Sequence, residues 1–250
     1  MATAGRIRLD ELLVRQGHFP SRSRARDAVL RGAVCVDGSV ERRPGRPVSE
    51  DAPTAVSDPG QAYVARSALK LIAGLDRFAV EVAGATALDI GASTGGFSQV
   101  LLERGAACVV AIDVGHGQLH ESLRSDPRVI AVEGLNARDL TAGHLGGRAP
   151  DLLVADVSFI SLRLALPPAL ALAAPGACAV VLVKPQFEAG REAIGKGGLL
   201  RDPAAARPVA EGVATWFAGH PGWRVLGLVE SPIEGGDGNR EFLLAAVKEG

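Results

Sequence analysis

The sequence predicts an α/β fold, in which strands and helices alternate along the chain and the strands form one mainly parallel sheet. Three observations support this prediction. From residue 63 onward, short apolar runs alternate with amphipathic stretches, which is the pattern of repeated strand–helix units. The first of these runs ends in a glycine-rich turn, the place where such folds approach a ligand. The last two runs are joined by a short connection, which makes that pair antiparallel.

Length and composition limit the classes of protein to which the chain can belong. Its 250 residues suffice for one α/β domain and a small additional module, and 47% hydrophobic with 22% charged residues indicates a folded globular protein. The three cysteines lie far apart, which favours reduced thiols in the cytoplasm over disulfides or a metal site. The first residues, MATAGRIRLDELL, contain no apolar segment of a secretion signal, which also predicts a cytoplasmic protein.

Residues 1–59 are expected to form a basic module of two helices followed by short strands. Ser21 is a suitable N-cap for the second helix, and Gly32 ends it. Residues 1–50 contain ten arginines and six acidic residues, a net charge of +4, whereas the remainder of the chain carries −5. A solvated arginine-rich helix is the simpler interpretation, but the charge asymmetry favours a polyanionic partner for this module.

The order of residues in RLDELLVRQGHFPSRSRARDAVLRGAVCVDG resembles the small RNA-binding domain of ribosomal small-subunit protein four. The resemblance covers about fifty residues and preserves glycines, apolar positions and arginines in order. It implies that the module binds RNA, with affinity from phosphate contacts rather than from sequence recognition. The arginines expected to contact RNA are Arg6, Arg8, Arg22, Arg24, Arg26 and Arg31.

Prolines at 44, 47, 53 and 59 mark a connector, and residues 60–250 are expected to form the second domain. It begins with YVARSALKLIAGLDRF, an amphipathic stretch that predicts a helix carrying Lys70. Lysine is rare in this arginine-rich chain, which indicates a position that needs a compact or titratable cation. An exposed helix lysine with no further role is an equally good interpretation.

The glycine-rich turn follows the apolar run at 86–90 and spans Gly91 to Gly96, with a helix expected from about Phe97. Glycine lets the backbone approach a ligand, and a helix N-terminus offers unpaired N–H groups. The turn differs from the dinucleotide fingerprint because Ser93 stands where that pattern has glycine. The next apolar run ends in Asp113, placed to accept hydrogen bonds from ribose hydroxyls. Together the two features predict a nucleoside-cofactor site, although a glycine turn alone can be only a tight turn.

Charged residues end two later strands. Asp156 follows the apolar run LLVA, and Lys184 closes CAVVLV. Open α/β sheets bind ligands at the carboxyl ends of their strands, so both side chains are expected at the same crevice as the glycine turn. A lysine that closes an apolar strand is costly unless its ammonium reaches a partner. Glu241 opens the final strand.

Residues 164–183 contain no charged side chain and could be mistaken for a membrane span. Pro167-Pro168 and Pro175-Gly176 divide the stretch, which predicts a helix, a turn and a strand instead.

The segments DIGASTGGF, VKPQFE and EGGDGNREFLL, with the strand that ends in Asp156, resemble the TlyA family within the FtsJ-like ribose methyltransferases. The resemblance covers nearly the whole chain. It implies a Rossmann-like class I methyltransferase sheet of seven strands, the last antiparallel, behind an RNA-binding domain. The family methylates a cytidine ribose 2′-oxygen in ribosomal RNA with S-adenosylmethionine. One departure is ARSALKL around Lys70, where members usually have a glycine-rich RGGLKL.

The resemblance also implies site residues. The catalytic tetrad would be Lys70, Asp156, Lys184 and Glu241, and no metal is implied. Residues expected to contact the cofactor are Asp89, Gly91, Ser93, Thr94, Gly95, Gly96, Phe97, Asp113, Val114, Asn136 and Asp156. Lys184 would either remove the hydroxyl proton or stabilise the developing alkoxide.

Ribosomal RNA or a ribosomal subunit is the expected partner; neither DNA nor a membrane is expected. A non-catalytic RNA-binding or ribosome-assembly factor with an inactive methyltransferase fold is the main alternative. A haemolysin-type membrane-active protein is the other, but the divided apolar stretch and the intact cofactor turn argue against it.

Overall fold

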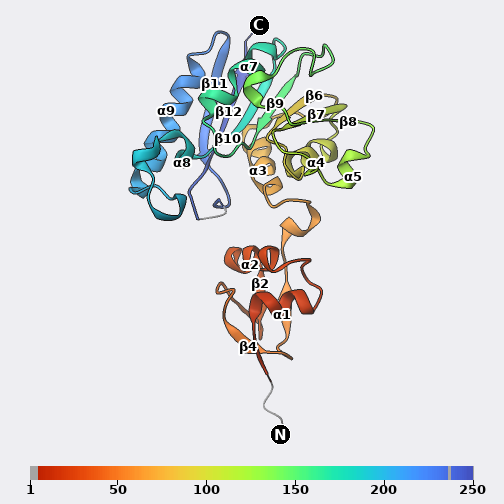
Figure 1. The fold of residues 1–250 in the computed structure, drawn as a ribbon, viewed down its shortest axis with the longest axis vertical. Helices are drawn as coiled ribbons and strands as arrows, with labels where there is room; N and C mark the ends of the chain where they lie inside the picture. Colours follow the sequence, from red (N-terminus) through yellow and green to blue (C-terminus); the bar gives the residue numbers. More distant parts are fainter. Residues whose placement is uncertain (1–4, 236–237, 250) are drawn as a thin grey trace. The chain divides into compact units, whose positions relative to one another are not determined.

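The computed structural model describes residues 5–235 and 238–249, and the chain divides into two compact units, Met1–Ala62 and Tyr63–Gly250 (Figure 1). The first unit packs two helices against short antiparallel strands. β1 pairs with β4, and β2 lies between β3 and β5. Its elements are β1 (Arg6–Arg8), α1 (Leu9–Arg15), α2 (Arg22–Arg31), β2 (Val34–Val36), β3 (Ser39–Val40), β4 (Pro47–Ser49), β5 (Thr54–Val56) and the 3₁₀ turn η1 (Pro59–Ala62).

The bounds of α2 follow from its sequence. Ser21 Oγ accepts a hydrogen bond from the Arg24 amide, and Gly32 ends the helix in the left-handed conformation, as predicted. Ala25, Ala28 and Val29 are buried on one face, so the arginines of α2 are left to the other faces of the helix.

In the second unit, seven strands of the described residues form one sheet in the order β11-β12-β10-β9-β6-β7-β8. β8, β7, β6, β9 and β10 run parallel, whereas β12 is antiparallel to both β10 and β11. The strands are β6 (Thr86–Ile90), β7 (Cys108–Asp113), β8 (Val129–Glu133), β9 (Leu152–Ala155), β10 (Cys178–Val183), β11 (Trp223–Glu230) and β12 (Phe242–Lys248). This topology confirms the predicted fold class.

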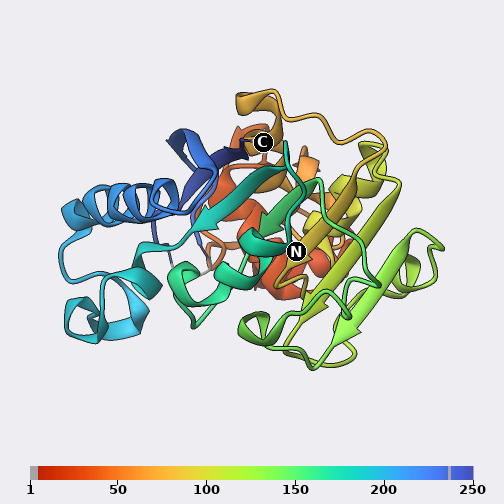
Figure 2. The ribbon, with the colours of Figure 1, turned by 90° about the horizontal axis from the view of Figure 1, so that it is seen from above.

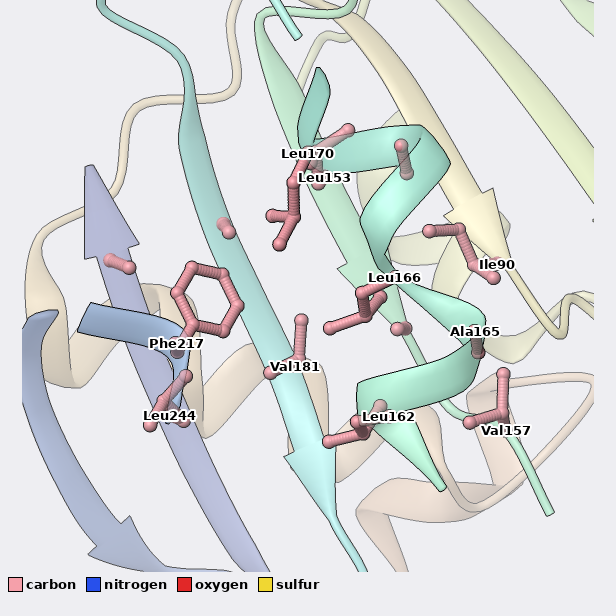
Figure 3. Close-up of a cluster of buried hydrophobic side chains, with 14 of the residues drawn as sticks. Ile90, Leu153, Val157, Leu162, Ala165, Leu166, Leu170, Val181, Phe217 and Leu244 are labelled. Carbon is pink, nitrogen blue, oxygen red and sulfur yellow. The ribbon is translucent and has the colours of Figure 1, made fainter. Parts of the chain in front are cut away.

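Helices cover both faces of this sheet (Figure 2). One buried cluster joins α3, α4 and α5 to the strands, and a second joins α6, α7 and α9 to the opposite face, where Phe217 and Leu166 pack near Val181 (Figure 3). The helices are α3 (Ala68–Phe78), α4 (Gly96–Glu103), α5 (Glu121–Arg124), α6 (Leu162–Ala165), α7 (Pro167–Leu172), α8 (Pro185–Glu188) and α9 (Ala206–Ala218), with 3₁₀ turns η2 (Ala137–Asp139), η3 (Arg191–Ala193), η4 (Lys196–Gly198) and η5 (Pro203–Ala205).

The uncharged stretch at 164–183 forms the end of α6, then α7 and β10, which agrees with the predicted helix, turn and strand. Its side chains contribute to the core: Leu166, Leu170 and Val181 are buried there. Within the described part of the chain, every helix is too short or too polar to cross a bilayer.

Candidate active site

Asp156 and Lys184 follow directly on the carboxyl ends of the neighbouring parallel strands β9 and β10. Their side chains form an ion pair, with Lys184 Nζ 2.6 Å from Asp156 Oδ1. The same ammonium donates a hydrogen bond to Ser158 Oγ at 2.8 Å. The structure therefore brings together Asp156 and Lys184, which we expected at one crevice because both follow the carboxyl ends of strands. It also places the hydroxyl group of Ser158 there, which the sequence did not suggest.

A second pair lies beside the first. Lys70, in the first turn of α3, is 2.5 Å from Glu241, although 171 residues separate them. Both side chains are buried, which excludes the interpretation of Lys70 as an exposed helix lysine. Glu241 precedes Phe242, and Phe242 is paired with Val183 in the sheet, so the start of antiparallel β12 lies at the edge where β10 ends. The four residues of the expected tetrad thus occupy one edge of the sheet.

Asp89 is the most deeply buried acidic group near this edge. Ser98 Oγ donates to its Oδ2 at 2.7 Å, while Oδ1 has no hydrogen-bond partner among the described residues. Burial raises the pKa of this carboxyl to about 7, and the neighbouring Asp156 and Asp113 act in the same direction. A buried acceptor without a donor is costly, so the group suits a ligand that brings a donor or a positive charge.

Packing against neighbouring protein atoms, and not only a bound ligand, accounts for glycines in the turn from Gly91 to Gly96. Gly91 has φ +80°, and a Cβ there would lie 2.8 Å from the carbonyl oxygen of Asp156. Gly95 has φ +98°, and its Cβ would lie 2.2 Å from a methyl group of Leu123. Glycine is therefore required at both positions because neighbouring protein atoms fill the space, a reason that the sequence alone did not provide.

Asp113 lies at the end of β7, where its carboxylate is held by two backbone amides. Ser93 N–H donates to Oδ2 at 2.8 Å and Gly115 N–H donates to Oδ1 at 2.7 Å. Each carboxylate oxygen keeps a second lone pair, so the fixed group can still accept hydrogen bonds from hydroxyls. The next residue, Val114, exposes 67% of its surface and offers an apolar face there. The fixed carboxylate of Asp113, the orphaned acceptor of Asp89 and the apolar face of Val114 fit a nucleoside ligand with a positive charge.

The remaining residues that we expected to contact the cofactor differ in which of their atoms a ligand could reach. Ser93 and Thr94 are exposed on the turn. Phe97 is only 2% exposed and belongs to the core, so it can offer a ligand its backbone alone. Asn136 caps η2, where its Oδ1 accepts a hydrogen bond from the Arg138 amide. Gly96 begins α4, and a Cβ there would lie 2.6 Å from Ser67 Oγ.

The six arginines expected to contact RNA fall into two groups, those that line a groove and those that contact a neighbouring segment. Arg8 and Arg22 both bind the buried carboxylate of Asp10, at 3.0 and 3.3 Å, and they line a groove of about 590 Å³ together with Arg26. Arg6 lines a second groove, of about 400 Å³.

Arg24 and Arg31 instead contact the segment that follows β5. Arg24 donates to the Gly60 carbonyl at 3.1 Å, and Arg31 forms an ion pair of 2.6 Å with Asp58. The side chain of Arg31 is 16% exposed, so it presents little surface to a partner. Arg22 and Arg26 are about one helical turn apart and therefore lie on the same side of α2. This spacing is the feature of the sequence that distinguishes them from Arg24 and Arg31.

The sequence analysis missed two residues that contact the candidate site. Ser158 contacts Lys184, and Glu188 accepts hydrogen bonds from the loop that carries Ser158. Glu188 closes VKPQFE, one of the segments that carry the family resemblance, and Ser158 lies two residues after Asp156, but nothing in their spacing distinguishes them from other polar loop residues.

Known proteins resemble the chain throughout its length. The FtsJ-like methyltransferase family matches residues 63–248, and the S4 domain matches residues 7–52. The 16S/23S rRNA (cytidine-2′-O)-methyltransferase TlyA of Mycobacterium tuberculosis is 48% identical over 96% of this chain and 90% of its own length. Hemolysin A of Brachyspira hyodysenteriae is 36% identical over 95% of this chain and 98% of its own length.

A solved structure from Streptococcus thermophilus, which carries a hemolysin designation, has 39% identity and a TM-score of 0.75, and the match covers 99% of this chain and 90% of that one. The fold, the order of the two units and these identities over nearly the full length agree. The chain belongs to the TlyA family of FtsJ-like methyltransferases.

Proposed function

We propose that this protein transfers a methyl group from S-adenosylmethionine to the ribose 2′-hydroxyl of a cytidine in ribosomal RNA. The observation that carries the proposal is the Lys184–Asp156 pair, with Lys70–Glu241 behind it, at the sheet edge that also holds Asp89. The name of the Mycobacterium tuberculosis relative, a 16S/23S rRNA (cytidine-2′-O)-methyltransferase, supports the same substrate class for this chain. With ribosomal RNA as substrate, we place its activity in the cytoplasm.

The groups that fit the cofactor are those described above. Asp113 would accept hydrogen bonds from the ribose hydroxyls, Val114 would pack against the adenine, and Asn136 would lie beyond it. Asp89 would provide its unpaired Oδ1 to the cationic part of the ligand. When bound, S-adenosylmethionine supplies a sulfonium methyl group that is already electrophilic.

The chain itself must orient the ribose hydroxyl and assist the loss of its proton. Lys184 is the group we assign to this task, because its ammonium contacts both Asp156 and Ser158 at the carboxyl ends of the parallel strands. As a neutral amine it would accept the hydroxyl proton; as an ammonium it would stabilise the alkoxide. Lys70 and Glu241 are buried behind it and contribute by fixing the charge distribution of the edge.

The arginines Arg8, Arg22 and Arg26 line one groove of the first unit, and Arg6 lines another, which supports RNA binding by residues 1–59 with catalysis by residues 60–250. Arg24 and Arg31 contribute less surface.

The test is to treat ribosomal RNA with the protein and labelled S-adenosylmethionine and then to map alkaline cleavage. Alkaline cleavage needs a free 2′-hydroxyl, so the modified nucleotide should resist it. Normal cleavage despite stoichiometric methyl incorporation would place the methyl group on the base and overturn the proposal. Cofactor and RNA binding without any incorporation would identify a non-catalytic RNA-binding factor instead.

A further inference from the structure

The loop from β9 to α6 is held at both of its ends by residues of the β10–α8 segment. At its start, Lys184 contacts Asp156 and Ser158 at 2.6 and 2.8 Å. At its end, the carboxylate of Glu188 accepts two hydrogen bonds, from Ser161 Oγ at 2.6 Å and from the Leu162 amide at 2.7 Å. The position of this loop relative to β10 therefore depends on Lys184 and Glu188 together.

One of the two residues between the attachments at Ser158 and Ser161 is in an unfavourable conformation. Phe159 has φ +65°, in the left-handed region that a bulky side chain rarely adopts, and it is 92% exposed. Its ring packs on Phe187, with centroids 5.3 Å apart. Such a conformation persists only where its surroundings impose it. Relaxation of Phe159 would move Ser158, which precedes it directly, away from Lys184.

Lys184 and Glu188 stand at the two ends of α8, a single helical turn that begins with the buried Pro185. Lys184 is in extended conformation directly before this turn and Glu188 ends it, yet both side chains contact the loop from β9 to α6. Without the carboxylate of Glu188, these contacts would hold the loop to this segment only through Lys184.

We propose that Glu188 is a positioning residue for methyl transfer: by fixing Ser161 and Leu162, it keeps Asp156 and Ser158 at the catalytic ammonium of Lys184. This inference rests on the function proposed above. Leu162 is the first residue of α6, so the carboxylate of Glu188 could also act only as a cap of this helix. Such a role alone would alter stability without altering turnover. The two roles are therefore separable by experiment.

The first test compares Glu188→Ala and Glu188→Gln with Glu192→Ala, an exposed carboxylate on the adjacent turn η3. For Glu188→Ala we expect kcat to fall by about 10–100-fold, the usual cost of losing a group that orients a catalytic residue. KM for RNA and the Kd for S-adenosylmethionine should change little. Glutamine can accept from the Leu162 amide and donate to Ser161 Oγ, so Glu188→Gln should recover most of the rate. Glu192→Ala should match the wild type.

The second measurement is hydrogen exchange of the amides at 156–162 in the full chain. The loop should exchange faster in Glu188→Ala, while β9 and β10 keep their protection. In a double-mutant cycle, Ser158→Ala should cost less in the Glu188→Ala background than in the wild type, because both variants disturb the same arrangement.

A Glu188→Ala protein with faster loop exchange and wild-type kcat would overturn the inference while leaving the proposed function intact. If Glu188→Ala does not fold, a folded Glu188→Gln protein decides: recovery of most of the rate supports positioning by hydrogen bonds, and a 10–100-fold loss would refute it. A wild-type protein that incorporates no methyl group would instead refute the proposed function.

Discussion

Both units pair buried carboxylates with cations, but the cations that bind Asp10 and Glu41 in the first unit are exposed, whereas the cation that binds Glu241 in the second is buried. In the first unit, Asp10 is 4% exposed while its partner Arg8 is 52% exposed, and Glu41 is 7% exposed while Arg43 is 76% exposed. In the second unit, both members of the Lys70–Glu241 pair are buried, at 6% and 3%. The first arrangement presents guanidinium groups to the surroundings, whereas the second retains ammonium groups inside the fold.

The difference shows how one interaction can serve binding or catalysis. An arginine held at its base by a buried acid keeps most of its donors available for a phosphate, so its orientation is fixed without loss of surface. A lysine enclosed with its carboxylate has lost its water, and its charge acts through a medium of low dielectric constant. Substitutions in the second unit should therefore have larger effects than equivalent substitutions in the first.

The largest effect is expected for Lys184→Ala. The methylation rate should fall by about 10²–10⁴-fold, the range for a positioned acid–base group, while the Kd for S-adenosylmethionine stays near the wild-type value. Single-turnover methylation and calorimetry measure the two quantities. A Lys184→Ala protein that works at the wild-type rate would move the catalytic assignment to Lys70.

Glu241→Ala should destabilise the second unit by about 3–5 kcal/mol, because it leaves the buried ammonium of Lys70 without a partner. Trp216 and Trp223 both lie in this unit, so denaturant unfolding followed by tryptophan fluorescence reports on it. Asp10→Ala, the matched change in the first unit, leaves its arginines half-exposed and should not alter that transition. Equal loss of stability in the two variants would contradict the comparison.

The two units should also respond to pH in opposite directions. Burial raises the pKa of Asp89 to about 7, so the native state retains a proton that the unfolded chain releases above about pH 4. This contribution to stability is lost as pH rises from about 4 to 7 and amounts to at most about 4 kcal/mol. Asp89→Asn should abolish it, as seen in the fluorescence-detected Tm between pH 4 and pH 8. An unchanged pH dependence in Asp89→Asn would exclude this carboxyl as the source.

Glu41 provides the contrasting case in the first unit. Hydrogen bonds from the guanidinium groups of Arg43 and Arg46 lower its pKa to about 2. Its contribution to stability is therefore present above about pH 4.5 and is lost as pH falls toward 2, the reverse of Asp89.

Asp113→Ala should weaken S-adenosylmethionine binding by about 1.5–3 kcal/mol, the scale of a hydrogen bond to a charged group. Isothermal calorimetry on the full chain measures this directly. The variant also frees the amides of Ser93 and Gly115, so its fold is checked by the tryptophan transition. Unchanged affinity in a folded variant would remove Asp113 from the cofactor site.

The smallest effect is expected on the basic surface. Arg22→Ala and Arg26→Ala should each lower RNA affinity modestly and reduce the slope of log K against log salt by about 1, as for one phosphate contact. Arg31→Ala is the matched control, because that side chain is directed to Asp58. A larger change in slope for Arg31→Ala than for Arg22→Ala would show that the groove is not the RNA surface.

The sequence was most informative where a rule of topology applied. The mainly parallel sheet, the antiparallel last pair and the meeting of Asp156 with Lys184 follow from alternating strands and helices, from a short connection and from the position of ligands at carboxyl ends. The cap of α2 at Ser21 and its end at Gly32 follow from local chemistry.

Contacts that depend on loop conformation or on distant segments could not be predicted. Nothing in the sequence pairs Arg31 with Asp58, or Glu188 with the loop before α6. Gly91 and Gly95 were recognised as special, but the carbonyl and methyl groups that require them belong to elements 28 to 65 residues away. Such details depend on tertiary packing, which local patterns do not encode.

The position of β12 in the sheet determines when, during synthesis of the chain, Lys70 can meet Glu241. This strand emerges from the ribosome after the other six, yet it lies between β10 and β11 and is hydrogen-bonded to both. Lys70 is synthesised 171 residues before Glu241, the carboxylate that it contacts in the folded protein. Until that residue is made, the edge of the sheet that holds Lys70 lacks its carboxylate partner. Long-range pairing of this kind slows folding, and the contact between Lys70 and Glu241 can form only after Glu241 has been synthesised.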